Sequence, residues 1–472
     1  MSLPDDRFDR TFLSLVVTLV LGAVLALINT TIVGVALPQV ATDFDAGIDA
    51  LSWVGTAYIL AMAFAIPLSG WATIRYGMRR TWLVALTVFT IGSGLAAAAP
   101  GIGFLIGVRA VQGFGGGMLE PLMLTAIAQT AGPSRMGRAM GIVAATIGLG
   151  PLVGPLLGGA AIQLLDWRWM FAAFVPLGVL ALVLSARILP RTASAPHRLD
   201  RFGLFLIGFG SLGLLFGLSQ AARPSGMDVT GWVAAVVGAL LLVGYVRWAR
   251  HRADRAIVSL APFRVGGFLP AATVMLMMGV AIYPLFYGLP QFFQGVFGYG
   301  ALSSGALLAP QGAGAMIGMS LGGRLSDHRS TRVLVASGGL AATAGSLAYV
   351  LVGADASLWV YIAASIVTGA GIGFVGGPTV SSLYRVLAAD LVPAGSTLLF
   401  VLNQLGGALG IAAMTVVIGA AGDNRTEWGS AAGTVPMLLP MLGAAIVVVI
   451  AMRLPGVPGE APLARDDVTA AA

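Results

Sequence analysis

Residues 139–163 read AMGIVAATIGLGPLVGPLLGGAAIQ and contain no charged residue. A helix needs roughly 20 apolar residues to cross the hydrocarbon core of a bilayer, so this stretch is long enough to span one. Small residues at positions 150, 154 and 158 allow a neighbouring helix to approach closely, and two prolines bend the chain. The stretch therefore predicts a closely packed transmembrane helix.

The whole chain has the composition of a membrane protein. Of its 472 residues, 58% are hydrophobic and 10% are charged, and the mean hydropathy is +0.93. Soluble domains carry about 25% charged residues, so a soluble enzyme and a disordered protein are excluded. Cysteine is absent and the three histidines are far apart, which argues against a metal site. Lysine is absent too, so there is no Walker-type nucleotide loop, and we expect no cofactor.

The hydropathy pattern predicts an all-α membrane protein with 14 transmembrane helices, because backbone hydrogen bonds in lipid must close within each segment. The candidate segments are residues 11–36, 50–73, 81–100, 102–129, 139–163, 168–189, 203–221, 231–249, 267–290, 301–323, 331–353, 357–381, 396–420 and 433–453.

The arginines predict the orientation of these segments. The net charge is +7 and every basic residue is an arginine. A basic chain can bind nucleic acid, but here the arginines fall in short loops between apolar runs, which favours loops that face anionic lipid. With the N-terminus inside, 22 arginines lie on the cytoplasmic side, three lie outside and Arg109 lies within a span. Both termini are therefore expected to be cytoplasmic, and the first segment is expected to be a retained helix.

An internal repeat relates the two ends of the chain. The loops that begin at Gly70 and Gly323 are both rich in arginine, and segment 102–129 can be laid over segment 357–381. We therefore expect two six-helix bundles, over 11–190 and 267–454, with two inserted helices in 191–266 and a cytoplasmic tail over 455–472. The overlay places three glycines on three others: Gly113 on Gly369, Gly115 on Gly371 and Gly117 on Gly373.

Of the two overlaid segments, only 102–129 contains charged residues, and segment 357–381 has Ser365, Thr368 and Gly376 at the positions of Arg109, Gln112 and Glu120. Glu120 is the one acid that lies deep in a predicted span, and an intramembrane ionisable group is a functional candidate. Arg109 lies about three turns earlier, about 16 Å along the same helix. We expect one face of that helix to present Arg109, Gln112 and Glu120 to the space between the bundles, with Glu120 and Arg109 as proton-coupling residues. The alternative is that these groups only stabilise helix packing.

Other polar and aromatic residues in the spans are candidates for substrate binding. An amide can hydrogen-bond a substrate, but it can equally join two helices. Aromatic side chains can line an apolar pocket or simply pack against lipid. The candidates are Asn29, Gln112, Tyr283, Tyr287, Asn403 and Gln404.

Several motifs resemble those of the major facilitator superfamily, and within it the fourteen-helix drug:proton antiporters. Residues 141–159 match that family's antiporter motif at every glycine and at Pro155. Residues 105–115, which read LIGVRAVQGFG, match its second signature, and residues 166–171 read DWRWMF, which is also similar. The family usually has an acid where this chain has Asn29 and another where it has Ile74. The resemblance implies conformational roles for Gly70, Arg75, Gly77, Arg79, Gly150, Gly154, Pro155, Gly158, Gly159 and Asp327.

The resemblance implies a monomeric, proton-coupled antiporter that exports lipophilic drugs or antibiotics by alternating access in a bacterial inner membrane. Its expected partners are a small lipophilic molecule, protons and the lipid bilayer, with no nucleic acid, and no enzymatic activity is expected. Asn29 in place of an acid leaves open a dedicated exporter of one secondary metabolite or lipid. A membrane sensor that does not transport is a third alternative.

Overall fold

Apolar helices make up the fold in this computed structural model. The residues that the structure describes are 10–131, 139, 142–143, 146, 150, 153–154, 157, 165–192, 194–196, 198–220, 228–252, 255–299, 301–326, 328–351, 357–388, 390–420 and 438–454. Statements below about what is present or absent apply to these residues.

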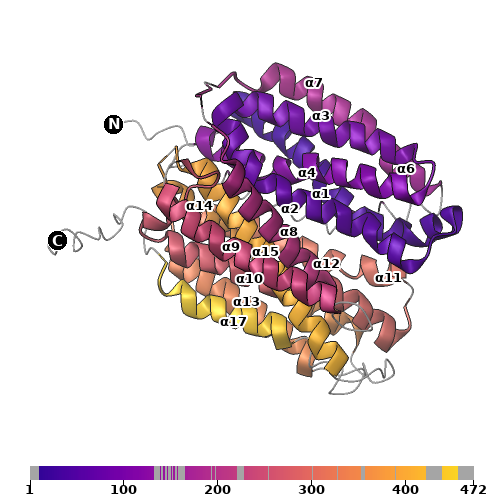
Figure 1. The fold of residues 1–472 in the computed structure, drawn as a ribbon. Coiled ribbons are helices and arrows are strands. Elements are labelled where there is room, and N and C mark those ends of the chain that lie inside the picture. Colours follow the sequence, from indigo (N-terminus) through magenta and orange to yellow (C-terminus); the bar gives the residue numbers. More distant parts are fainter. Residues whose placement is uncertain are drawn as a thin grey trace.

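In chain order the helices form a first half, an inserted hairpin and a second half (Figure 1). The first half contains α1 (Arg10–Phe44), α2 (Ile48–Tyr76), α3 (Met78–Ala97), α4 (Ile102–Ala131), α6 (Trp167–Ala172) and α7 (Phe174–Ile188). The inserted hairpin contains α8 (Arg201–Gln220) and α9 (Val229–Arg252), and a short 3-10 helix η3 (Ala261–Arg264) follows it. The second half contains α10 (Phe268–Phe297), α11 (Ala301–Ala306), α12 (Ala309–Leu325), α13 (Thr331–Leu351), α14 (Leu358–Val386), α15 (Val392–Ala420) and α17 (Leu438–Ala451).

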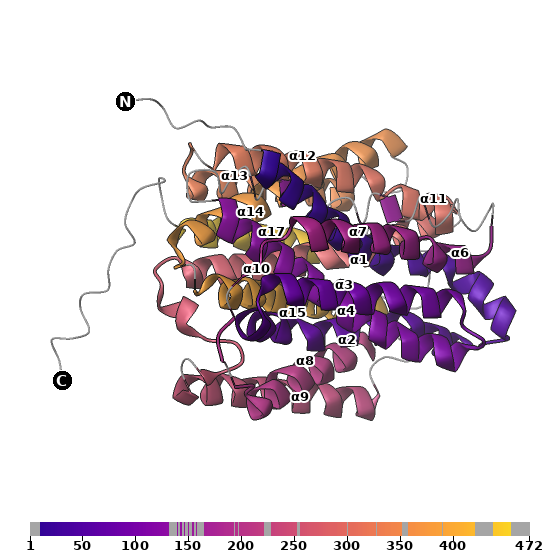
Figure 2. The same cartoon turned by 90° about the horizontal axis from the view of Figure 1, so that it is seen from above.

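Each half packs mainly around one glycine-rich helix. In the first half α4 contacts α1, α2 and α3, and in the second half α14 contacts α10, α12 and α13. The halves meet where α15 contacts α2 and α4. The inserted hairpin lies at one edge of the molecule, with α8 against α2 and α15 and α9 outermost (Figure 2).

Eleven of the described helices are long and apolar enough to cross a membrane. The chain is therefore an all-α, multi-pass membrane protein, as the sequence predicted. Three of the fourteen predicted spans are not among the eleven. Segment 139–163 lies mostly outside the described residues, α17 has 14 residues, and segment 301–323 is divided into α11 and α12. That division falls just before Pro310, which has no N–H to donate to a preceding turn.

Some helices differ in length from the hydropathy segments. The first predicted span ends at residue 36, whereas α1 continues to Phe44 and has 35 residues. The segment over 168–189 is interrupted at Ala173, between α6 and α7. Hydropathy detects the apolar run, but the helix ends where its hydrogen bonds end, so polar turns beyond the bilayer are missed.

The glycines of the proposed repeat make corresponding contacts in the two halves. A Cβ atom on Gly113 would lie 2.2 Å from the carbonyl oxygen of Tyr58 on α2, and one on Gly369 would lie 2.0 Å from that of Gln311 on α12. Gly117 and Gly373 also face α2 and α12, whereas Gly115 and Gly371 face α3 and α13. These glycines let backbones touch, so the sequence overlay corresponds to equivalent helix packing.

Candidate functional site

A cavity of about 410 Å³ lies between the two halves. Residues of α1, α2, α4 and α8 line it from one side, and residues of α10, α12, α14 and α15 line it from the other. Most of the lining side chains are aliphatic, aromatic or methionine. Such a cavity suits an apolar molecule of drug size, because ligand sites are mostly apolar with a few placed polar groups.

Glu120 is the only acidic side chain among the described residues that line this cavity. It lies on α4 immediately before Pro121 and is half-buried. Among the described residues it has neither a hydrogen-bond partner nor an ion-pair partner. Gly376 on α14 is the residue equivalent to Glu120 in the repeat. It lines the same cavity but has no side chain. The cavity therefore contains one carboxyl group in a mostly apolar wall.

A second polar group lies in the wall that the second half contributes. Tyr283 on α10 donates its hydroxyl to Gln404 on α15 and lies 3.4 Å from the side-chain oxygen of Asn403. Asn403 in turn donates to the backbone carbonyl of Met275 at 3.0 Å. These three of the six predicted binding residues thus line the cavity, and their mutual bonds hold them in place. Tyr287 lies on α10, but its side chain is outside the described part of the chain.

Arg109 is fully enclosed in the first half, where it has no acidic partner among the described residues. Its Nε donates to the backbone carbonyl of Val54 at 3.1 Å. Its Nη1 donates to the side-chain oxygens of Asn29 and Gln112, the latter at 2.5 Å. The guanidinium also lies 4.1 Å from the ring centroid of Tyr58, which is cation–π distance. Neutral oxygens and a ring therefore stabilise this charge in place of a carboxylate.

The expectation that Arg109, Gln112 and Glu120 face the inter-half space together is wrong for the first two. Gln112 is fully buried, accepts from Arg109 and donates to Ser93 on α3 at 2.8 Å. Asn29 is fully buried as well, and neither amide lines the cavity. The surroundings of each side chain depend on its position along α4. At Arg109 the helices α1, α2 and α3 close around α4, whereas two turns further on α4 borders the cavity.

The Asn29 amide nitrogen has no hydrogen-bond partner among the described residues. Its oxygen accepts from Arg109, so only half of the amide is satisfied. A buried donor without a partner costs about 1–3 kcal/mol. This orphan lies at the position where the resembling family usually has an acid.

The two halves touch at the end of the bundle that carries most loop arginines, called the arginine-rich end below. Thr125 of α4 donates to Ser396 of α15 at 3.2 Å, and Ser396 also bonds Tyr384 at 2.7 Å. Gly70 of α2 faces Thr397, whose hydroxyl would lie 3.3 Å from an added Cβ. Small residues and hydroxyl groups thus bring the two halves into contact at this end.

The loop after α2 is joined to the chain that follows α7. Gly77 has a φ of 83°, which a side chain would strain, and an added Cβ would lie 2.9 Å from Thr192. The backbone N–H of Met78 donates to the Thr192 hydroxyl at 2.7 Å, and Arg79 donates to the carbonyl of Ala186. Gly77 and Arg79 thus hold the arginine-rich end of the first half together.

The remaining motif residues are only partly described. The Arg75 guanidinium lies 5.7 Å from the ring centroid of its neighbour Tyr76. Gly150 packs against Leu27 of α1, and Gly154 is a buried helical residue. Four other predicted motif residues lie outside the described residues: Pro155, Gly158, Gly159 and Asp327.

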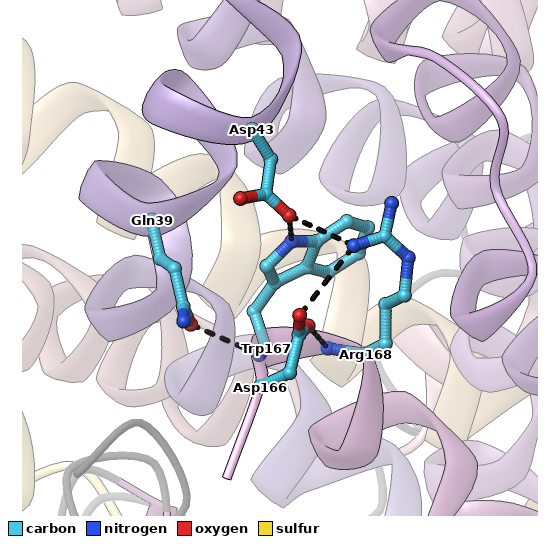
Figure 3. Close-up of polar contacts among 5 residues, drawn as sticks. All are labelled: Gln39, Asp43, Asp166, Trp167 and Arg168. Atoms are coloured by element: carbon cyan, nitrogen blue, oxygen red, sulfur yellow. Dashed lines mark hydrogen bonds and ion pairs between the residues drawn. The ribbon is translucent and has the colours of Figure 1, made fainter.

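A polar cluster ties α1 to α6 at the opposite end of the first half (Figure 3). The Trp167 indole and the Arg168 guanidinium both donate to Asp43, each at 2.8 Å. Gln39 accepts from the backbone N–H of Trp167 at 2.9 Å, and Asp166 caps α6 by accepting from the N–H of Arg168. The hydrogen bonds from Trp167 and Arg168 lower the pKa of the Asp43 carboxyl.

Sequence reasoning missed the methionines of the cavity. Met62, Met275, Met278 and Met319 line it from three helices. The run MLMM at 275–278 is the available signal, because methionine is flexible and polarizable and recurs at surfaces that accept varied ligands.

Two related helical halves around a central cavity define a membrane transport protein of the secondary-transporter type. Residues 19–411 match the Major Facilitator Superfamily, and the chain belongs to that family of transporters, which are not enzymes.

Curated relatives of the chain include bacterial proteins named for drug resistance. The chain is 35% identical over 417 residues to the multidrug resistance protein B homolog of Mycobacterium tuberculosis (strain ATCC 25618 / H37Rv), covering 88% of this chain and 77% of that protein. It is 26% identical to the multidrug transporter protein MdtP of Bacillus subtilis (strain 168), covering 90% and 78%.

Solved structures have the same fold. The proton:xylose symporter XylE matches with a TM-score of 0.67 at 15% identity, covering 94% of this chain and 96% of that one. The human organic anion transporter MFSD10 matches with a TM-score of 0.65 at 15% identity, covering 95% and 100%. Identities this low carry over the arrangement of helices and nothing about cargo.

Proposed function

We propose that the chain is a proton-coupled exporter of lipophilic small molecules that works by alternating access. The observation that supports this most is the single carboxyl group of Glu120 in the wall of an apolar cavity between the halves. The names of the two bacterial relatives agree with this cargo class.

Coupling follows from the cost of charge in an apolar cavity. A carboxylate without a partner is poorly solvated there, so it is stabilised either by a proton or by a cationic cargo, but not by both together. Cargo entering from the inside displaces the proton, and a proton arriving from the outside displaces the cargo. A ligand can drive the change between states only through different affinities for them, and the protonation of Glu120 supplies that difference.

In this proposal Arg109 acts as a fixed positive charge behind the cavity rather than as a cargo contact. Its partners are neutral, so its field reaches along α4 toward Glu120. The positive-inside pattern supports a bacterial inner-membrane orientation with both termini cytoplasmic, which places the arginine-rich end in the cytoplasm. A monomer contains the whole cavity, so no second copy is required.

The test is transport by the purified protein in proteoliposomes with an imposed pH gradient. The probe is tetraphenylphosphonium, a lipophilic cation. Glu120→Gln keeps the size of the side chain but removes the titratable group, so gradient-driven transport should fall at least about tenfold. Asp45→Asn is the matched control, because Asp45 is exposed, lies outside the cavity and has a φ of 47° that asparagine tolerates. Undiminished proton-linked transport by Glu120→Gln would refute the proposal.

A dedicated exporter of one compound is the second candidate. The observation that favours it is the ordered group Tyr283–Asn403–Gln404, which offers directional hydrogen bonds that a nonselective pump does not need. A susceptibility panel in a pump-deleted bacterial host separates the two. Resistance to many unrelated lipophilic compounds supports the first candidate, and resistance to one scaffold supports the second.

A further inference from the structure

The two helices of the inserted hairpin differ in their surroundings. In its apolar window, 44% of α8 is buried, compared with 17% of α9. Large apolar side chains of α9, such as Leu240 and Val233, are exposed, as expected of a lipid-facing helix. The helix α8 lies between α9 and the two halves (Figure 2). A hairpin that only filled space in the bilayer would not need to bury one of its helices in this way.

The inner helix reaches the cavity. Leu215, Leu218 and Ser219 of α8 are among the residues that line it. They lie at the end of α8 remote from the arginine-rich end, on the same side as Thr56 of α2 and Ile411 of α15. The inserted hairpin is therefore part of the cavity wall and not only an appendage.

Specific contacts hold α8 against α2. The ring of Phe216 stacks on Trp53, with centroids 5.6 Å apart and planes 24° from parallel. Phe209 meets Phe64 edge to face at 5.7 Å, and a Cβ on Gly208 would lie 2.6 Å from the Phe64 ring. Aromatic pairs of this kind stabilise packing by more than the burial of their surface area alone. These contacts fix the position of α8 along α2, and hence the position of its three residues that line the cavity.

Close backbone packing fixes α9 behind α8. A Cβ on Gly217 would lie 2.6 Å from the carbonyl oxygen of Gly231, and one on Gly238 would lie 2.7 Å from that of Gly210. The base of the hairpin is also fastened, because Tyr245 both donates to and accepts from the backbone of Val258. The hairpin is therefore a rigid pair, and α8 cannot turn its lining residues away independently.

We infer that α8 closes the seam between α2 and α15 beside the cavity, and that Leu218 and Ser219 limit the width of the cargo. This inference rests on the proposed function, since it names a specificity-determining wall of the same site. Without α8, the cavity would open sideways to lipid between α2 and α15, the helices of the two halves against which α8 packs.

The absence of cysteine allows a direct test that does not depend on transport. Single cysteines at Ser219, Ile411 and Leu240 are treated with a charged, water-soluble methanethiosulfonate in proteoliposomes. A thiol reacts as its thiolate, which requires water, so a cysteine facing lipid stays unmodified. We expect Ser219→Cys to react like Ile411→Cys, the cavity control, and Leu240→Cys to stay unmodified. If Ser219→Cys behaves like Leu240→Cys, or if all three react equally, the inference is overturned.

The width is tested with methyltriphenylphosphonium and tetraphenylphosphonium, which differ by one phenyl ring in place of a methyl group. Leu218→Trp should lower transport of the larger cation about fivefold relative to the smaller one, which corresponds to about 1 kcal/mol. The same change in the lipid-facing Leu240 should leave the ratio unchanged. An unchanged ratio in Leu218→Trp contradicts the inference. If the unsubstituted protein transports neither cation while Ser219→Cys still reacts, the proposed function is contradicted and the inference about the wall is not.

Discussion

Helices α4 and α14 are equivalent in packing and opposite in chemistry. Both bring glycines against two neighbouring helices at almost the same separations. At the three levels where α4 has Arg109, Gln112 and Glu120, however, α14 has a serine, a threonine and a glycine. The comparison indicates that close packing is a property of both halves, whereas the charged side chains on which the proposed coupling depends lie only on α4.

Moving the acid to the other half gives the strongest test of this comparison. The double variant Glu120→Gln with Gly376→Glu places a carboxyl on α14 in the same cavity. Space exists, because a Cβ at Gly376 meets only the flexible ends of Met319 and Met278, at 3.1 and 3.2 Å. We expect the double variant to regain at least about a third of the gradient-driven transport that Glu120→Gln loses, since one titratable group suffices.

The control for this exchange is Gly376→Glu alone, which keeps Glu120. Transport in that variant shows whether the new side chain blocks the cavity. If Gly376→Glu alone is active and the double variant remains inactive, the position of the acid matters as well as its presence, and the two halves are not interchangeable.

The glycine contacts predict matched losses of stability. Gly113→Ala and Gly369→Ala each place a methyl group against a backbone carbonyl, and overpacking of this kind costs about 1–3 kcal/mol. Thermal unfolding in detergent should show similar decreases for both variants. Gly107→Ala is the control, because nothing lies within 4 Å of its Cβ, and it should be neutral or stabilising. A large difference between the first two would contradict the equivalence of the halves.

The unequal polar positions predict unequal responses at Asn29 and Ser365. Asn29→Asp replaces a donor that has no partner with an acceptor for Arg109. The new charged hydrogen bond should contribute about 1.5–3 kcal/mol, so the unfolding temperature should rise. Ser365→Ala removes one hydroxyl contact with Tyr349, at 2.6 Å, and should lower stability by about 1 kcal/mol. Destabilisation by Asn29→Asp would show that the desolvation penalty of the buried ion pair exceeds its electrostatic attraction.

The smallest expected effect concerns the cluster at Asp43. Its pKa is lowered by hydrogen bonds from Trp167 and Arg168, so its contribution to stability is present above the ordinary pKa of an aspartate. That contribution is lost as the pH falls below about 4. Trp167 fluorescence should report a local change in that range, and Asp43→Asn should remove the change. A transition that persists in the variant would belong to another group.

The helical architecture was predictable because hydropathy and the recurring glycines can be read directly from the sequence. Glu120, Tyr283, Asn403 and Gln404 were also predictable as cavity residues, since a polar group in a span needs a reason to be there. The enclosure of Asn29, Gln112 and Arg109 was not, because it depends on how far along α4 the neighbouring helices diverge. The role of α8 was out of reach for the same reason: its apolar sequence resembles that of any lipid-facing helix.

The hydroxyl contact between Thr125 and Ser396 has an energetic consequence. A neutral hydrogen bond of this kind contributes about 1 kcal/mol net, which corresponds to roughly a fivefold population ratio. A hydrogen bond this weak adds little to the barrier between conformers, so under the proposed function one proton or one bound cargo can shift their balance. Strong ion pairing at the same place would instead trap the molecule and slow its turnover.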